Sequence, residues 1–566
     1  MTTQLGPTYR AETLLELDGH SFDVAIIGGG ITGVGCALDA ASRGLSVALI
    51  EQRDLGSGTS SRSSKLIHGG LRYLEQLSFR LVREALHERE LLLQSIAPHL
   101  VWPIPFIYPL KHRIWERAYV ALGISVYDGL AKLGHSTLPH QRHLGKKDLK
   151  TAFPSVKAGE FVGGIRYYDA GTDDARLVVA VARTAAGMGA KILTSARVTG
   201  FGRDGDGRVD SIEATCLESG RELNIGASVV INATGVWTDA TEMLVGDVDT
   251  DVTASKGIHI LVPKSAIDST VGIITKTKSS VLFLIPRGEF WIIGTTDTPW
   301  ELDLAHPAAS ERDIEYLLEQ ANRILERPLT PDDVIGVFAG LRPLVTGNAE
   351  STAKLSREHS ITEPVPGLIT VAGGKLTTYR VMARDTVDRV CDAANMRVPE
   401  SKTDQIALVG ATGYSTMKSN VERLGSQYGL SETEVKRLLR RYGSEATTVL
   451  ELAASDPMLA RQIPSGPYLG AEVRFAVDNE AALHLDDVLT RRTRLSIECE
   501  DRGTEGAEFV ASIMAPLLDW DQDAVDREIV HYVKRVQAER ESQTKPDDQT
   551  ADAARLGAPD IRTLGA

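Results

Sequence analysis

FDVAIIGGGITGVGCALDAASRGLSVALIEQRD, residues 22–54, contains a strand pattern, a glycine-rich turn, a helix pattern and a second strand pattern in direct succession. The apolar run FDVAII predicts a buried strand, and a helix is expected over 31–43, followed by the strand SVALI. Gly28, Gly30 and Gly33 fill the G-x-G-x-x-G spacing at the start of this helix. Because all these parts are present in order, the segment predicts a dinucleotide site rather than a glycine-rich turn without a ligand.

Each glycine of this turn has a physical role in holding a nucleotide. Gly28 permits the tight turn, Gly30 lets the backbone approach a pyrophosphate, and Gly33 lets the helix pack close to the strand. The phosphates then meet free N–H groups at the positive end of the helix dipole. Glu51 closes the second strand, 23 positions after Gly28 (51 − 28), where a carboxylate accepts hydrogen bonds from ribose hydroxyls.

The loop that follows, residues 56–65 (GSGTSSRSSK), is rich in hydroxyl side chains. Thr59, Ser60 and Ser61 lie beside the predicted phosphate turn and are candidates to donate hydrogen bonds to the pyrophosphate. A solvated serine-rich loop is the alternative for each of them. Their position next to the turn favours binding.

Composition limits the class of protein. The chain has 566 residues, 42% of them hydrophobic, which is enough for two or three domains. A net charge of −14 argues against nucleic acid as the main partner, although a local basic pocket remains compatible with an anionic ligand. The four cysteines form no C-x-x-C pair, which predicts neither a disulfide framework nor a zinc site and fits a reducing cytoplasm. We find no signal-peptide pattern and no run of about 18 apolar residues, so no integral membrane segment is expected.

The rest of the chain divides into a strand-rich and a helix-rich part. Strand patterns dominate residues 165–369, with hairpin turns expected within 200–214 and between VLFLI and FWIIG. Residues 228–239 (SVVINATGVWTD) predict a buried strand that returns the chain to the nucleotide-binding sheet. Helical spacing of apolar residues then follows over 431–442, 472–484, 485–493 and 524–538.

Three segments resemble the FAD-dependent glycerol-3-phosphate dehydrogenases: TSSRSSKLIHGGLRYLE (59–75), VAGGKLTTYRVMARD (371–385) and DDVLTRRTRL (486–495). The resemblance covers about residues 22–538, and the two Gly-Gly segments carry most of it. It implies an FAD enzyme that oxidises sn-glycerol 3-phosphate to dihydroxyacetone phosphate and passes electrons to a membrane quinone. Some members of the family use oxygen instead.

The predicted fold class is therefore α/β, with an FAD-binding Rossmann-like domain interleaved with an antiparallel-sheet substrate domain, plus an all-α C-terminal domain. We expect an N-terminal extension over residues 1–20, the two interleaved domains over 21–395 and the helical domain over 396–540. Residues 541–566 have few large apolar side chains and are expected to form a disordered tail.

The second glycine-rich turn is placed to serve the flavin end of the cofactor. An oxidised flavin becomes negatively charged when it takes a hydride, so positive potential is needed beside the ring. A strand followed by Gly373, Gly374 and a helix start supplies free N–H groups, and Lys375 adds a full charge. The alternative is a strand-to-helix turn with a surface lysine. We expect cofactor contacts from both turns, and also from Gly235, Leu376 and Thr377.

A glycerol phosphate substrate requires several convergent cations, because charge-assisted hydrogen bonds hold phosphate oxygens best. The resemblance implies Arg72, Arg342, Arg357 and Lys375 for this role, with Tyr73 as a further hydroxyl contact. Taken singly, an arginine is more often a surface ion-pair partner than a ligand, and Arg342 is the exception. Arg342 is the strongest candidate, because it lies between apolar residues and directly before a proline.

Loss of a hydride from C2 requires that the C2 hydroxyl lose its proton in step, and a group that titrates near neutrality suits this role. His259, in SKGIHILVP, is the preferred base, although a hydrogen-bonded core histidine has the same sequence pattern. Alternatively, Arg342 stabilises the forming alkoxide and water takes the proton. His140 and His143 lie in a segment that we expect to be a solvated loop, with no nearby cysteine or acidic partner in the sequence, so we expect no metal site.

Contact with a membrane is suggested by residues 113–132 (RIWERAYVALGISVYDGLAK), an apolar run flanked by cations and aromatic residues. A buried core helix has the same composition, and the quinone acceptor favours the membrane surface. We therefore expect a cytoplasmic protein at the inner face of the cell membrane, with a homodimer as one candidate assembly. Three alternative functions remain open: a glycerol-3-phosphate oxidase, a hydroxy- or amino-acid dehydrogenase on the same scaffold, and a flavin-binding adaptor without turnover.

Overall fold

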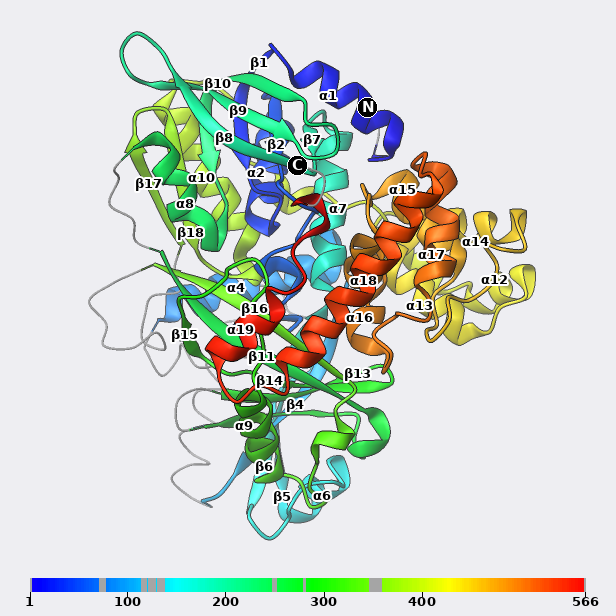
Figure 1. Cartoon of the computed structure of the whole chain (residues 1–566). Coiled ribbons are helices and arrows are strands. Elements are labelled where there is room, and N and C mark those ends of the chain that lie inside the picture. Colours follow the sequence, from blue (N-terminus) through cyan, green and yellow to red (C-terminus); the bar gives the residue numbers. More distant parts are fainter. Residues whose placement is uncertain are drawn as a thin grey trace.

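The structure is a computed structural model that describes residues 3–70, 78–112, 120, 129, 138–246, 252–277, 281–345 and 359–563. Two β-sheets are stacked end to end in the view of Figure 1, and the C-terminal helices lie along one side of both. The fold class predicted from the sequence is confirmed: an α/β nucleotide-binding part interleaves with an antiparallel sheet, and an all-α part follows.

The first sheet contains the predicted nucleotide-binding unit. Within the described residues it has eight strands, and its main path runs β17-β18-β10-β1-β2-β7. The pairs β1–β2, β1–β10, β10–β18 and β2–β7 are parallel, whereas β8, β9 and β17 are added in antiparallel pairs. The strands are β1 (Ser21–Ile27), β2 (Val47–Ile50), β7 (Lys191–Leu193), β8 (Ala196–Arg203), β9 (Val209–Cys216), β10 (Glu222–Asn232), β17 (His359–Val365) and β18 (Leu368–Gly373).

Strand β10 confirms the predicted return of the chain to this sheet. It pairs in parallel with β1, with Val230 opposite Ala25. The predicted Asp-Gly hairpin is also present, as the antiparallel pair β8–β9. Buried side chains of β1, β2 and β10 share one apolar core with α2 (Ile31–Ser42), α7 (Asp174–Gly187) and α10 (Tyr379–Ala393). The helix expected over 31–43 is α2. It packs on the sheet whose strand β1 leads into the glycine-rich turn.

The second sheet is largely antiparallel. Ten strands belong to it in the described part of the chain, with the path β15-β11-β14-β13-β12-β4-β6-β3, to which β16 is added on β11 and β5 on β6. The predicted VLFLI–FWIIG hairpin is the antiparallel pair β13–β14. The strands are β3 (Leu66–Ile67), β4 (Val101–Leu110), β5 (Arg142–Gly145), β6 (Gly163–Thr172), β11 (Val252–Pro263), β12 (Gly272–Lys276), β13 (Val281–Arg287), β14 (Phe290–Gly294), β15 (Thr298–Trp300) and β16 (Gly336–Val345).

The helices outside the nucleotide-binding unit divide between the two sheets. These helices, with the N-terminal one, are α1 (Pro7–Leu17), α4 (Phe79–Leu91), α6 (Lys146–Ala152), α8 (Thr238–Glu242) and α9 (Glu311–Asn322). Helices α4, α6 and α9 pack on the second sheet, whereas α1 and α8 contact strands of the first. Buried side chains of α9 pack on β11 and β14 in one apolar core. His143 lies on strand β5, so our placement of it in a loop was wrong: it pairs with Ile165 at the edge of the sheet.

The C-terminal part is helical and has an apolar core of its own. Its helices are α11 (Tyr414–Lys418), α12 (Val421–Tyr428), α13 (Glu432–Tyr442), α14 (Ala446–Ser455), α15 (Gly470–Asn479), the π-helix η11 (Asp487–Thr493), α16 (Leu495–Glu498), α17 (Ala507–Met514), α18 (Gln522–Ser542) and α19 (Asp548–Arg555). Each of the four predicted helical segments overlaps such an element, although 472–484 extends beyond the end of α15 at Asn479. The domain boundary at residue 395 stays a prediction.

The expectation of a disordered tail from residue 541 is wrong. Helix α19 and the turn after it pack on the body, and Figure 1 shows α19 across the face of β11 and β16. Lys256 on β11 forms an ion pair with Asp548 at 2.5 Å, and Arg562 forms one with buried Asp487 at 3.0 Å. Charged side chains hold this segment, and therefore its low apolar content is a poor guide to its order.

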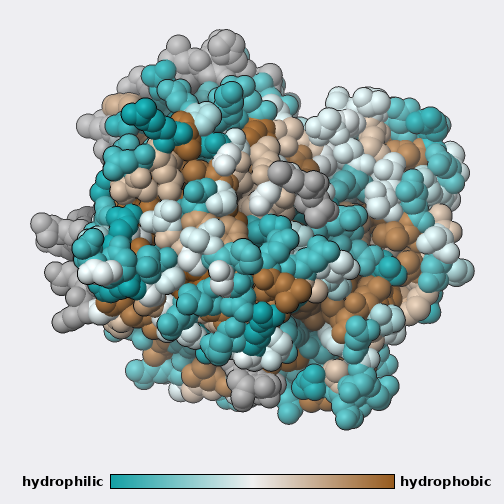
Figure 2. Space-filling model, turned by 90° about the horizontal axis from the view of Figure 1, so that it is seen from above, coloured by the Kyte–Doolittle hydropathy of each residue, from teal (hydrophilic) through white to brown (hydrophobic). Residues whose placement is uncertain are grey.

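On the face shown in Figure 2, small groups of hydrophobic residues are scattered among hydrophilic ones. Among the described residues, no helix combines the length and the apolar character needed to span a lipid bilayer. Residues 113–132 lie outside the described part, apart from residues 120 and 129, so the structure does not address their predicted membrane contact.

Candidate cofactor and substrate site

Two adjoining cavities lie where the two sheets meet. The larger has a volume of about 460 Å³ and the smaller about 200 Å³. They share wall residues, among them Ile31, Thr59, Ser60, Lys375 and Leu376. Gly28 and Lys375 both line the smaller cavity, so the two glycine-rich turns, far apart in the sequence, face one space that continues into the larger cavity.

The first turn forms the nucleotide end of the smaller cavity. Gly28 has φ +109°, and a Cβ there would approach the carbonyl oxygen of Ala233 at 2.7 Å. A Cβ on Gly33 would overlap the carbonyl oxygen of Gly28, so only glycine permits this contact between helix and turn. Gly30 lines the cavity at the start of α2. Gly33 does not line this cavity. It lies behind the turn and allows α2 to pack closely against it.

Glu51 lies at the far wall of the smaller cavity, at the end of β2. Its Oε2 accepts a hydrogen bond from the backbone N–H of Gly29 at 2.6 Å, and its Oε1 accepts one from that of Arg53 at 2.8 Å. Burial raises the pKa of Glu51, and these two N–H donors oppose that rise. The carboxylate is thus fixed against the glycine-rich turn, and its contact with a ribose stays a prediction.

The three hydroxyl residues of the following loop differ in their surroundings. Ser60 and Thr59 line both cavities. The hydroxyl of Ser60 accepts a hydrogen bond from the N–H of Ile31 at 3.0 Å, and that of Thr59 donates to the carbonyl of Leu341 at 2.7 Å. Ser61 lines neither cavity, and its carbonyl accepts from Lys65 Nζ at 3.0 Å. The structure therefore brings two of the three to the cofactor space.

The second turn forms the opposite wall. Gly373 and Gly374 have φ +76° and +79°, and Lys375 precedes the 3-10 turn η8 (Leu376–Thr378) that leads into α10. Gly374, Lys375 and Leu376 line both cavities. The other three predicted residues are divided: Gly373 and Gly235 line the smaller cavity, and Thr377 lines the larger.

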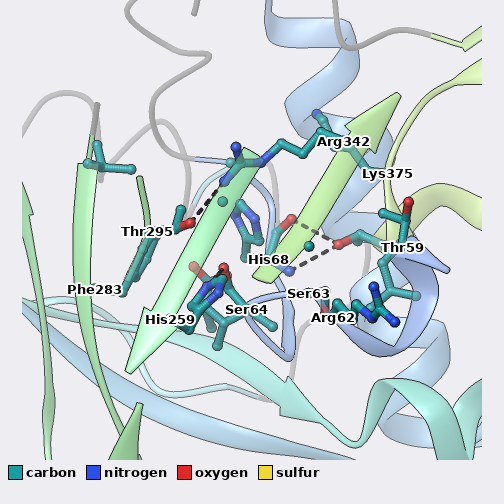
Figure 3. Close-up of a pocket in the computed structure, with 18 of the residues that line it drawn as sticks. Thr59, Arg62, Ser63, Ser64, His68, His259, Phe283, Thr295, Arg342 and Lys375 are labelled. Atoms are coloured by element: carbon teal, nitrogen blue, oxygen red, sulfur yellow. Dashed lines mark hydrogen bonds between the residues drawn. The ribbon is translucent and has the colours of Figure 1, made fainter. Parts of the chain in front are cut away.

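His259 and Arg342 face the larger cavity from neighbouring strands, β11 and β16. Figure 3 shows His259 beside Ser64, and Nε2 of the ring lies 2.8 Å from the serine hydroxyl. The ring stacks on Phe338 with centroids 4.7 Å apart. Burial, together with the charges of Arg342 and Lys65, lowers the pKa of His259 to about 3, so the ring is neutral at neutral pH.

Arg342 is held in place by polar groups at the cavity wall. Its Nη1 lies 3.2 Å from Asp297 Oδ1, and its Nη2 donates to the hydroxyl of Thr295 at 3.1 Å, as drawn in Figure 3. About a quarter of the side chain (24%) remains exposed, although the residue lies within a strand of the second sheet. The guanidinium is thus oriented and still open to an anion in the cavity.

Several lining residues were missed by the sequence analysis: Arg62, Ser64, His68, Asp169, Phe283 and Thr295. The segment TSSRSSK contains two of them, and its density of polar residues beside the phosphate turn is the signal that was available. Phe283 lies on β13 and Thr295 follows the end of β14, and the pairing of these strands, which no local pattern shows, brings both to the cavity. Three predicted substrate residues lie outside the described part of the chain: Arg72, Tyr73 and Arg357.

Comparison with known proteins agrees with this geometry. The family model described as FAD dependent oxidoreductase matches residues 23–389, and the model described as C-terminal domain of alpha-glycerophosphate oxidase matches residues 401–525. Glycerol-3-phosphate dehydrogenase 2 of Mycobacterium tuberculosis is 50% identical over 560 residues, which cover 99% of this chain and 95% of that protein. The human protein named glycerol-3-phosphate dehydrogenase, mitochondrial, is 37% identical over 542 residues, covering 91% of this chain and 73% of that protein.

A solved structure supports the same relationship at the level of the fold. The X-ray structure of glycerol-3-phosphate dehydrogenase from Bacillus halodurans complexed with FAD superimposes with a TM-score of 0.77 at 29% identity. The match covers 94% of this chain and 98% of that one. The sequence resemblance, the two family models and the near full-length relatives agree, and this chain belongs to the family of FAD-dependent glycerol-3-phosphate dehydrogenases.

Proposed function

We propose that the protein oxidises sn-glycerol 3-phosphate to dihydroxyacetone phosphate with FAD as its hydride acceptor. The observation that carries this proposal is the joined cavity: Gly28 and Lys375 line one space, which continues to His259 and Arg342. Such an arrangement suits an elongated dinucleotide whose reactive ring lies next to a polar substrate pocket.

The residues present fit FAD. The tight turn at Gly28, the cavity-lining Gly30 and the fixed carboxylate of Glu51 would hold the adenosine and pyrophosphate. Gly374 and Lys375 would lie at the flavin end, where a backbone turn and a cation favour negative charge. When bound, FAD would serve as the acceptor of the hydride from the substrate.

Substrate recognition is assigned to cations at the larger cavity. Arg342 would hold the phosphate with two N–H groups, and Lys375 would add a second positive charge. We assign Arg72, Tyr73 and Arg357 to the same pocket from the resemblance alone. A phosphate among these groups would distinguish glycerol 3-phosphate from glycerol and from small hydroxy acids.

His259 is assigned as the group that takes the proton of the C2 hydroxyl. Its neutral ring has a lone pair available, and its contact with Ser64 fixes the orientation of Nε2. Arg342 is one cause of the lowered pKa of His259, so a phosphate bound to Arg342 would raise that pKa and make the ring a stronger base. The C2–H bond then breaks with its electron pair leaving as hydride, while the O–H proton passes to the ring and a C=O bond forms.

We further propose a quinone as the final electron acceptor and attachment to the cytoplasmic face of the cell membrane, with residues 113–132 as the contact. Both proposals rest on the resemblance and on the composition of that segment. A homodimer is the assembly we would test first.

The reaction is tested by anaerobic addition of glycerol 3-phosphate, glycerol or lactate to FAD-loaded protein, with the flavin absorbance followed. Glycerol 3-phosphate alone should bleach the yellow colour rapidly, because only it carries the phosphate that Arg342 and Lys375 would bind. Bleaching by lactate instead would favour the acid-specific enzymes, and an unchanged spectrum with all three compounds would favour a binding protein without turnover.

The acceptor is tested in the same preparation under air and with a soluble quinone analogue. We expect quinone reduction in step with turnover and little hydrogen peroxide. Peroxide formed in equal amount to product would identify an oxidase and remove the quinone from the proposal.

A further inference from the structure

A separate small cavity of about 50 Å³ lies between the C-terminal helices and the second sheet. Its charged and titratable lining residues come from four parts of the chain: Arg62 after the 3-10 turn η1 (Thr59–Ser61), His306 before α9, Arg494 before α16, and Arg535, Glu539 and Arg555 on α18 and α19. Arg62 also lines the larger active-site cavity, so the two cavities have one residue in common.

Three hydrogen-bond donors at this cavity have no acceptor among the described residues. Nη1 of Arg535 and Nη1 of Arg555 are buried without a hydrogen-bond partner there, and the two residues are only 7% and 3% exposed. Nη2 of Arg555 lies 3.4 Å from Nδ1 of His306. Because a guanidinium can only donate, Nδ1 must accept, and the ring hydrogen is on Nε2, which is also buried without a partner.

The charges around this cavity leave a positive excess. Arg535 pairs with Asp486 at 2.9 Å, and Arg494 pairs with Asp173 at 2.7 Å. Glu539, the carboxylate in the wall, is shared by Arg535 at 3.0 Å and Arg555 at 3.5 Å.

Arg62 is the source of this excess positive charge. It donates to the carbonyl of Ala305 at 3.2 Å and makes no ion pair within the described part of the chain. Burial and the neighbouring arginines, Arg535 and Arg555 among them, lower the pKa of Arg62 to about 9. A buried excess cation beside unpartnered donors calls for an anion.

We propose that this cavity binds one small inorganic oxyanion, such as phosphate, between Arg62, Arg535, Arg555 and His306. A volume of about 50 Å³ exceeds the ~10–15 Å³ that a single water needs, and a tetrahedral oxyanion accepts several N–H donors at once. The anion fastens α18 and α19 to the loop after η1. It also shields the charge of Arg62 beside the active-site cavity.

Crystals of the FAD-loaded protein grown with sodium selenate test the location directly. The anomalous signal of selenium should show a peak in this cavity, with the selenate oxygens around it accepting hydrogen bonds from Arg535, Arg555 and His306. A cavity that holds only water under these conditions would overturn the proposal.

A solution experiment tests the same site through thermal stability. At equal ionic strength, phosphate should raise the Tm of the holoprotein by about 2 °C more than chloride does, because ligand binding to the folded state stabilises it. H306L removes one donor without breaking an ion pair and should abolish most of this difference. H306Q keeps a donor and should retain it.

Arg527 provides the matched control, because it is exposed on the same helix as Arg535. R527M should show the wild-type response to phosphate, which separates a local site from a general effect of charge. Any phosphate that binds in the active-site cavity would still stabilise H306L, so only the difference between the variants counts. Equal phosphate responses of wild type and H306L would contradict the proposal.

Discussion

The two ends of the joined cavity are built in different ways. Much of the nucleotide end comes from residues 27–60 and acts through the backbone, at Gly28, Gly30 and the Glu51-bonded N–H of Gly29. The reacting end acts through side chains such as His259 and Arg342, which strands β11 and β16 bring together. Cofactor binding should therefore depend on backbone shape at the first end, and turnover on side-chain chemistry at the second.

The largest effect should come from changing the backbone turn. In G33A, the added methyl group would overlap the carbonyl oxygen of Gly28 and push α2 away from the turn. We expect loss of bound FAD and a stability loss of about 1–3 kcal/mol, typical of overpacking. The ratio of flavin absorbance to protein absorbance in purified samples measures the first effect.

Gly205 gives the control for this substitution, because a Cβ there meets no atom within 4 Å. G205A should bind FAD as the wild type does. Normal FAD content in G33A would show that the turn does not hold the cofactor.

The next effect should arise at the reacting end and leave the cofactor in place. R342M removes two charge-assisted hydrogen bonds to phosphate, worth about 2 kcal/mol each, so kcat/KM for glycerol 3-phosphate should fall about 10³-fold. Steady-state kinetics of FAD-loaded enzyme measures this loss.

R397M, at an exposed arginine, should keep the wild-type rate. If R342M lost FAD together with activity, the division between the two ends would be wrong.

Removing the proton acceptor should give a smaller effect that is confined to turnover. In H259N, kcat should fall about 10²-fold with little change in KM, as expected for the loss of a general base. S64A removes only the group that orients Nε2, and its loss should be about tenfold. A raised KM at unchanged kcat in H259N would instead assign His259 to substrate binding.

The smallest effect concerns the attachment of the helical domain through His484, which lines neither cavity. His484 contacts Glu528 at 2.7 Å and Glu218 at 2.9 Å. Hydrogen bonds to these two carboxylates, against the opposing effects of burial and Arg562, raise the pKa of His484 to about 10. A raised histidine pKa gives stability that is complete below the unfolded pKa of about 6.5 and is lost as the pH rises toward the folded value.

The Tm of the wild type should therefore fall more steeply between about pH 7 and pH 10 than that of H484Q. Thermal unfolding followed by circular dichroism across this range measures the slope. H87Q, at an exposed histidine, should keep the wild-type slope. Parallel slopes for the wild type and H484Q would show that His484 is not charged in the folded protein.

The same contrast explains what the sequence could predict. The strand, turn and helix of the nucleotide end follow from local spacing, and the parallel return at β10 follows from an apolar run. Arg62, Ser64 and Thr295 were missed because their roles depend on which segments meet at the cavity. Pairing between distant strands leaves no mark in a local pattern.

The C-terminal segment shows a second limit of sequence analysis. Its composition indicated disorder, because apolar content is the usual measure of what a segment can bury. In the structure, ion pairs such as Lys256–Asp548 and Arg562–Asp487 join it to the body, in addition to a few buried apolar side chains. The composition of a segment does not show which charged residues of distant segments will pair with it. The ordered structure of the C-terminal segment therefore could not be predicted from its composition.

The crystal structure of the FAD-loaded protein would test the central claim most directly, namely that one cofactor spans both turns. We predict the adenosine beside Glu51 and the isoalloxazine ring between the Gly374–Lys375 turn and His259. An isoalloxazine ring bound away from Lys375, or a cofactor confined to one of the two cavities, would contradict the account.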